Sequence, residues 1–65
     1  MAYQSLTFKG VTTPEQVNKI TTALMMLDGV DSAEVGRYGA EVEGRAKRET
    51  LIKAVEKLNL GVKVS

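Results

Sequence analysis

Two pairs of acidic residues are the first side chains in this 65-residue chain whose types and spacing could support chemistry. Glu41 and Glu43, or Asp28 and Asp31, could place two carboxylates together for acid–base catalysis or for binding Ca²⁺. The chain has no Asp-x-Asp-x-Asp-Gly calcium loop, and so short a chain is not expected to enclose a deep cleft. We therefore expect these carboxylates to be solvated surface groups.

The adjacent methionines Met25 and Met26 are a second candidate. Two thioethers could hold copper(I) loosely, because this soft ion prefers sulfur ligands. Exposed methionines also adapt to protein partners. Their position at the end of a predicted helix favours ordinary packing, with one methionine beside the core and the other exposed.

Cysteine and histidine are both absent, which removes most other site chemistry. Without them the chain has no disulfide, no thiolate nucleophile and no zinc site of the usual tetrahedral kind. It also lacks the imidazole that most often serves as a general base. We therefore expect a protein that is not an enzyme and that holds no cofactor.

The charge balance and the hydropathy pattern restrict the partners and the location. A net charge of +1 lacks the basic excess of a nucleic-acid or membrane-surface binder. No apolar run approaches the roughly 18 residues of a membrane span, and the N-terminus lacks the pattern of a signal peptide. We expect one domain over residues 1–65, located in the cytoplasm, with no nucleic-acid and no membrane partner.

The first half of the chain predicts a strand followed by a capped helix. Leu6 and Phe8 alternate with polar residues, which predicts a strand over residues 2–9. Thr13-Pro14-Glu15-Gln16 then matches a capping box, in which the threonine hydroxyl and the glutamine side chain each satisfy a backbone N–H of the other residue. Four apolar residues on one stripe continue the helix, and Asp28-Gly29 is expected to end it. These four are Val17, Ile20, Leu24 and Leu27.

The second half predicts a hairpin, a helix and a last strand. Residues 30–44 alternate on both sides of the turn Gly36-Arg37-Tyr38-Gly39. Helical spacing returns over residues 47–58, and Val62 and Val64 then alternate around Lys63. The order βαββαβ predicts an α+β, ferredoxin-like sandwich, with a four-stranded antiparallel sheet and two helices on one face.

The apolar and glycine positions carry a family resemblance. They comprise Gly10-Val11-Thr12-Thr13-Pro14-Glu15-Gln16, Val17, Ile20, Ala23-Leu24, Leu27, Gly29-Val30, Val35, Leu51, Ala54-Val55 and Leu58. This pattern resembles the heavy-metal-associated domain, a family that includes copper chaperones and the N-terminal modules of copper-transporting ATPases. The family pattern begins with Gly-Met-Thr-Cys-x-x-Cys, and the match here covers nearly the whole chain without the cysteines.

The resemblance implies that the two metal-binding cysteines fall on Thr13 and Gln16. Val11 takes the place of the family's methionine, and Asn59-Leu60 takes the place of a Gly-aromatic pair near the metal loop. In the family, two thiolates hold a soft ion at the start of the first helix, where the helix N-terminus favours the thiolate. A hydroxyl and an amide are neutral, hard and weak ligands for copper(I). We therefore expect a degenerate site that holds no metal and forms an ordinary helix cap.

The sheet face opposite the helices is expected to be polar. It should carry Ser5, Thr7, Lys9, Glu34, Glu41, Glu43 and Lys63. RNA-binding domains of similar topology stack bases on aromatic residues of the two central strands, whereas one central strand here presents two glutamates. We expect a solvated face with cross-strand charge pairs.

The sequence thus predicts a non-enzymatic binding module of copper-chaperone type, which acts through protein contacts and binds no soft metal by itself. A metal-transport component is the expected partner. The first loop and a basic group before the second helix could contact it, although that group could equally serve solubility. The predicted contact residues are Val11, Thr12, Thr13, Gln16, Arg45, Lys47 and Arg48.

Two other functions stay open at this point. The chain could be a functioning metal-transport or metal-homeostasis protein that completes its site with the N-terminal amine, with Met25 and Met26, or with a partner's thiolates. It could also be a small-molecule-binding regulatory domain that acts as a dimer. Edge strands offer a further route to dimers, so we expect a monomer or a weak homodimer.

Overall fold

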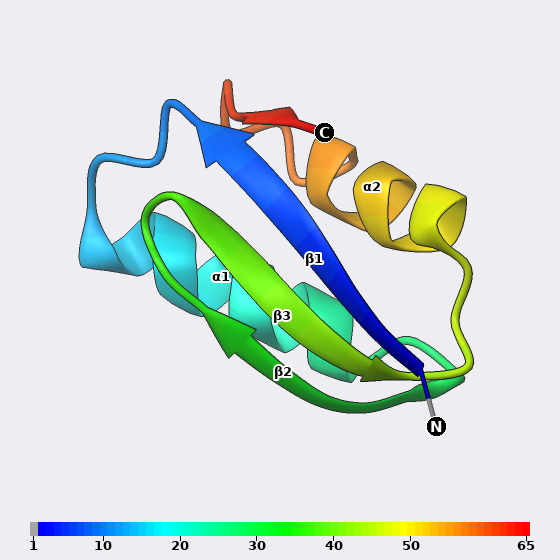
Figure 1. Ribbon diagram of the computed structural model, residues 1–65. Helices are drawn as coiled ribbons and strands as arrows, with labels where there is room; N and C mark the ends of the chain where they lie inside the picture. The colour runs from blue at the N-terminus through cyan, green and yellow to red at the C-terminus, as the bar shows by residue number, and fades with distance from the viewer. Residues whose placement is uncertain (1) are drawn as a thin grey trace.

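The structure is a computed structural model that describes residues 2–65. Its elements follow the predicted βαββαβ order (Figure 1). They are β1 (Ala2–Lys9), α1 (Pro14–Met25), β2 (Val30–Val35), β3 (Gly39–Gly44), α2 (Arg48–Glu56) and β4 (Lys63–Val64).

The four strands form one sheet in the order β2-β3-β1-β4. Every neighbouring pair is antiparallel: β1 pairs with β3 from Ala2↔Gly44 to Thr7↔Gly39, and with β4 at Phe8↔Val64 and Lys9↔Lys63. Figure 1 looks onto the sheet from the side that no helix covers, with α1 behind β3 and β2. The predicted ferredoxin-like fold, with both helices on one face, is confirmed.

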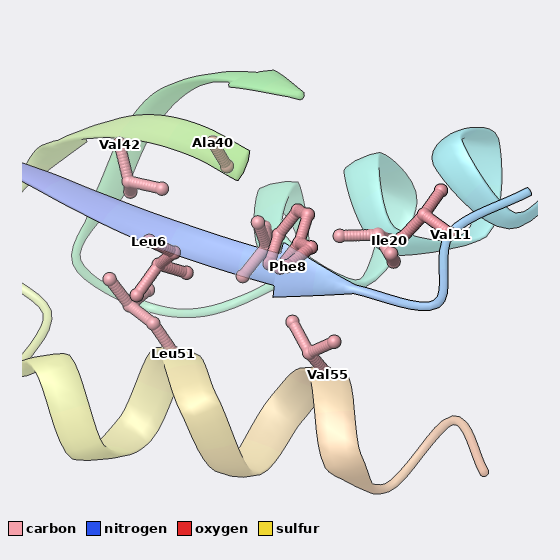
Figure 2. Packing of buried hydrophobic residues seen from close by; sticks show 9 residues of the cluster. Leu6, Phe8, Val11, Ile20, Ala40, Val42, Leu51 and Val55 are labelled. Atoms are coloured by element: carbon pink, nitrogen blue, oxygen red, sulfur yellow. The ribbon is translucent and has the colours of Figure 1, made fainter. Parts of the chain in front are cut away.

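The core lies between that covered face and the two helices. Leu6 and Phe8 project from β1, and Leu51 and Val55 project from α2 toward them (Figure 2). Ile20 and Leu24 of α1 are fully buried on the other side of the core. The remaining buried members are Val11, Ala40 and Val42. The predicted alternation of β1 and the predicted stripe of α1 therefore supply the core, as their spacing requires.

The observed ends of the two helices agree with the predicted ends only in part. Helix α1 begins where the capping box places it, but it ends at Met25, about one turn before the Asp28-Gly29 that was expected to stop it. Gly29 still adopts a left-handed conformation, with φ +87°, two residues after a tight turn in which Leu27 N–H donates to the Leu24 carbonyl. Helix α2 spans Arg48–Glu56 rather than residues 47–58.

A backbone irregularity joins the start of β2 to the end of β3. The register shifts between Val30 and Ser32, so Asp31 is an extra residue in β2, a feature that the sequence pattern does not predict. Gly44 lies opposite with φ +145°, and a Cβ there would collide with the Gly29 carbonyl oxygen. That oxygen accepts the backbone N–H groups of Arg45 and Ala46. Glycine is therefore required at position 44 by both backbone conformation and close approach.

The uncovered face carries an aromatic residue that was not among those expected there. Tyr3 lies on β1 directly opposite Glu43 and is 73% exposed. Its hydroxyl donates a hydrogen bond to the Glu43 carboxylate, and this bond together with the charge of Glu43 raises the pKa of Tyr3. Burial and the charges of Glu41 and Glu34 act in the same direction. An aromatic residue is therefore present on this face, at its acidic end.

We expect Glu43→Gln to lower the titration midpoint of Tyr3 toward the ordinary tyrosine value of about 10, because the amide carries no charge that opposes the phenolate. The chain has two tyrosines, so phenolate absorbance is measured in a Tyr38→Phe background. Since the folded pKa is raised, the associated stabilisation is present below pH 10 and is lost as pH rises through the raised pKa. Glu56→Gln is the control, and an equal midpoint change in both variants would contradict the assignment.

Candidate functional site

The loop between β1 and α1 is the place where the family resemblance locates a metal site. Gly10 leaves β1 with φ +100°, and Val11 then enters the core with only 5% of its surface exposed. Thr12 and Thr13 are exposed, and Pro14 begins the helix. Val11 thus anchors the loop to the core, as expected for the position that replaces a methionine.

Hydrogen bonds between Thr13 and Gln16 close the start of the helix. The Gln16 backbone N–H donates to the Thr13 hydroxyl oxygen at 3.3 Å, and the Gln16 Oε1 accepts the Thr13 backbone N–H at 3.0 Å. This is the predicted capping box, and it is confirmed. The same Oε1 also accepts the Thr12 backbone N–H at 2.6 Å and the Thr12 hydroxyl at 3.2 Å. Its two lone pairs are therefore already occupied.

The side-chain NH₂ group of Gln16 links the loop to a residue near the C-terminus. The Gln16 Nε2 donates to the Leu60 carbonyl oxygen at 3.4 Å. Asn59, just before it, has a positive φ of 56°. The Asn59-Leu60 pair therefore lies beside the loop, where the resemblance places it.

These residues do not fit a copper(I) ion. The two positions that the resemblance matches to the family's cysteines hold a hydroxyl and a primary amide, and each side chain accepts a hydrogen bond from the backbone N–H of the other residue. Neither group is charged or soft, so neither competes with water and chelators for copper(I). Within residues 2–65 there is also no group of three or more acidic, cysteine or histidine side chains that could hold a metal ion.

The loop borders an apolar groove that reaches the β2–β3 hairpin. Its lining comprises Thr12, Thr13, Pro14, Val17, Asn18, Gly36 and Arg37. At the hairpin tip the Arg37 guanidinium lies 5.7 Å from the centre of the Tyr38 ring, and Tyr38 is 78% exposed. The sequence predicted a turn at Arg37 and Tyr38, but sequence spacing alone did not place Arg37 beside Thr12 and Thr13.

The predicted basic contact residues lie at the other end of the sheet. Arg45 and Lys47 belong to the loop after β3, which starts at Gly44, the partner of Ala2 at the beginning of β1 (Figure 1). The first loop follows the other end of β1, roughly 24 Å away along the strand. The structure therefore separates the predicted contact residues into two surfaces.

Arg48 has a local role in addition to its charge. Its guanidinium donates to the Ser5 carbonyl oxygen at 2.6 Å. Ser5 pairs with Glu41 of β3 on one side of β1, whereas β4 pairs with β1 at Phe8 and Lys9 and does not reach Ser5 on the other side. The Arg48 contact therefore satisfies a carbonyl that β4 does not cover.

The methionines cannot join Thr13 and Gln16 in one site. Both are exposed, Met25 by 47% and Met26 by 79%, so the expectation that one packs beside the core is wrong. They lie at the C-terminal end of α1, which over 12 residues places them roughly 18 Å from its start. The N-terminal amine of Met1, the other intrachain ligand considered, lies outside the described residues.

No helix within residues 2–65 is long and apolar enough to cross a membrane.

The fold and the loop together define a class of domain. A four-stranded sheet covered by two helices presents, at the start of the first helix, the two positions that the family resemblance matches to metal ligands. Here a hydrogen-bonded cap occupies those positions. The chain is thus a copper-chaperone-like domain in architecture, with a closed helix cap at the ligand positions.

Comparison with known proteins supports this class through structure. No protein-family model matches the chain, and no curated protein matches it in sequence. The CopZ metallochaperone has a TM-score of 0.87 and 22% identity, covering 98% of this chain and 100% of its own. A copper-binding domain from HMA7, a P-type ATPase, has a TM-score of 0.86 and 24% identity, covering 100% of this chain and 92% of its own.

A third structure has a higher sequence identity. The N-terminal domain of a potential copper-translocating P-type ATPase from Bacillus subtilis, solved in its Cu(I)-loaded state, has a TM-score of 0.85 and 28% identity. The match covers 97% of this chain and 82% of that domain. These neighbours are metal-handling domains rather than enzymes. The resemblance drawn from the sequence is confirmed, and the absence of cysteine agrees with a lost Cys-x-x-Cys motif.

Proposed function

We propose that this chain is a non-enzymatic protein-interaction module of copper-chaperone type, which contacts a metal-transport component and binds no soft metal ion by itself. The observation that carries the proposal is the mutual hydrogen bonding of Thr13 and Gln16. It replaces two converging ligands with a cap that needs no ion. The scaffold that presents the loop is nevertheless intact, which favours a function that depends on shape and surface.

The contact surface that we propose consists of Thr12, Thr13, Pro14, Arg37 and Tyr38, and we refer to it as the loop end. Three features support it. The groove beside the loop is largely apolar, Tyr38 is exposed beside the Arg37 guanidinium, and arginine and tyrosine are enriched among residues that dominate binding energies. Gln16 contributes by holding the backbone of the loop in place.

The basic group Arg45, Lys47 and Arg48 is a separate surface in this proposal. Because it lies at the opposite end of β1, a partner seated on the loop end does not reach it. Its charges would act on the encounter rate with an acidic partner, and less on the lifetime of the complex.

The test is binding to the copper-binding domains of metal-transport proteins from the same genome, with and without copper(I). We expect backbone amide shifts of the isotope-labelled chain to change around Thr12 and Arg37 to the same extent in both conditions. Arg37→Ala combined with Tyr38→Ala should weaken binding by at least roughly tenfold, because two anchor side chains are truncated.

Arg45→Ala is the matched control, since it removes one positive charge at the other end of the molecule. It should change the affinity less than the loop-end variant does. Binding that appears only with copper(I) and partner cysteines would instead support a metal-handling function with a shared site.

A further inference from the structure

The uncovered sheet face contains two pairs of like charges. Glu34 on β2 is directly opposite Glu41 on β3, and Lys9 on β1 is directly opposite Lys63 on β4. All four residues are exposed. Like charges at directly opposite positions destabilise a sheet, so neither pair is explained by the stability of the isolated chain.

The two pairs are too far apart to neutralise each other. Two strand spacings across the sheet and four residues along β1 separate their centres, a distance of roughly 17 Å. This exceeds the screening length of about 8 Å at physiological ionic strength. Ser5 and Thr7 of β1, which have short uncharged side chains, lie between the two pairs. The face is therefore divided into an acidic part and a basic part.

A shallow hollow lies within the acidic part. It is bordered by Ser5, Glu34 and Glu41, and it extends over Gly36 and Gly39, which have no side chain to fill it. Gly39 is the partner of Thr7 in the sheet and sits next to Ala40. Two carboxylates around a concave, glycine-lined surface form a receptor for an extended cationic side chain such as lysine.

We propose that this face binds a second copy of the same chain through a two-fold axis that lies between the two faces. Such an axis brings the acidic part of each copy onto the basic part of the other, because a two-fold contact between residues i and j always occurs twice. The Lys9 and Lys63 side chains of each copy then approach the Glu34–Glu41 hollow of its partner. Both like-charge pairs acquire opposite charges at the same time.

A second copy explains the face better than an unrelated partner does. A purely acidic partner would meet Glu34 and Glu41, and a purely basic one would meet Lys9 and Lys63, so either would repel half of the face. Only a surface with the same division of charge complements both halves, and the chain itself carries one. A face of four short strands is small, so the dimer should be weak, reversible and sensitive to salt.

The experiment uses two charge-swapped variants of the full chain. Glu34→Lys with Glu41→Lys makes both charge pairs basic, and Lys9→Glu with Lys63→Glu makes both pairs acidic. By sedimentation equilibrium at low salt we expect wild type to dimerise, each variant alone to be monomeric, and the mixture of both to form a heterodimer. About 500 mM salt should weaken both dimers by at least roughly tenfold, because it shortens the screening length.

Matched variants on α2 exclude general attraction between oppositely charged chains. Glu49→Lys with Glu56→Lys, and Lys53→Glu with Lys57→Glu, produce the same net charges on exposed positions of the helical side. Each should still form the wild-type homodimer. A dimer that forms only in the mixture of the two α2 variants, with neither α2 variant forming a homodimer by itself, would indicate general attraction and overturn the proposal.

A measurement on unmodified protein keeps the proposal testable even where a swapped variant fails to fold. The backbone amides of Ser5 and Thr7 should shift with protein concentration at low salt, while those of α2 stay constant. A wild-type chain that is monomeric up to about 1 mM at low salt, with concentration-independent amide shifts, would overturn the proposal, since weak interfaces associate in that range.

Discussion

Replacing Thr13 and Gln16 together with cysteine should create a copper(I) site. Both positions lie at the N-terminus of α1, where the helix lowers the pKa of a thiol and favours the thiolate. Each side chain already reaches the backbone N–H of the other residue. Metal ions held by thiolates in small domains gain binding free energies on the order of 10 kcal/mol. We expect the variant to take up a single copper(I) ion against a competing chromophoric chelator.

Three controls separate the loop from thiols in general. Wild type should bind no copper(I), zinc or cadmium under the same competition, and Thr13→Cys alone should bind weakly. Thr50→Cys with Lys53→Cys places two thiols at the same spacing on the exposed surface of α2. If this α2 pair binds copper(I) as tightly as the loop pair, the assignment of Thr13 and Gln16 to the ligand positions is wrong.

The new thiols also cost stability. Losing the threonine cap destabilises the helix start by about 0.5–2 kcal/mol, and Gln16 no longer holds Thr12 and Leu60. Circular dichroism before the titration establishes whether the double variant is folded. Copper(I) should then raise its unfolding temperature, because a ligand that binds only the folded state stabilises it.

Leu51→Ala should remove roughly half of the free energy of unfolding of the protein. Leu51 is fully buried and points from α2 toward Leu6 on β1 (Figure 2). Truncating a buried leucine costs about 2–5 kcal/mol, whereas a chain of this length has a total stability of about 3–10 kcal/mol. Urea unfolding followed by circular dichroism measures the difference.

Thr50→Ala is the matched control for this truncation. It changes an exposed residue of the same helix, so its effect should stay within about 0.5 kcal/mol. A loss of less than about 1 kcal/mol in Leu51→Ala would mean that the core rearranges to fill the space.

The sequence predicted helix boundaries accurately where hydrogen bonds between nearby residues define them, and less accurately elsewhere. Thr13, Pro14 and Gln16 fix the start of α1 through bonds within four residues, and the structure agrees with the expected cap. The end of α1 was placed too late because the tight turn at Leu27 competes with a further helical turn. The start of α2 has no such signal, since Lys47 makes no side-chain cap bond.

Parts of the candidate site depended on tertiary placement. Alternation shows that β1 and β3 have one polar face, but pairing Glu34 with Glu41 and Lys9 with Lys63 requires the register of the sheet. The separation of the basic group from the first loop does follow from topology. Because β1 and β3 are antiparallel, they run in opposite directions, and the loops that follow them lie at opposite ends of the sheet.

The closed cap has a consequence for regulation. A domain that carries two thiolates has an empty and a loaded state, so metal supply or thiol oxidation can switch it. In this chain Thr13 and Gln16 carry a neutral hydroxyl and a neutral amide at those positions, with no thiol to ionise or oxidise. Under the proposed function, in which these groups bind no metal, the contacts of the loop would be independent of cellular copper and redox state.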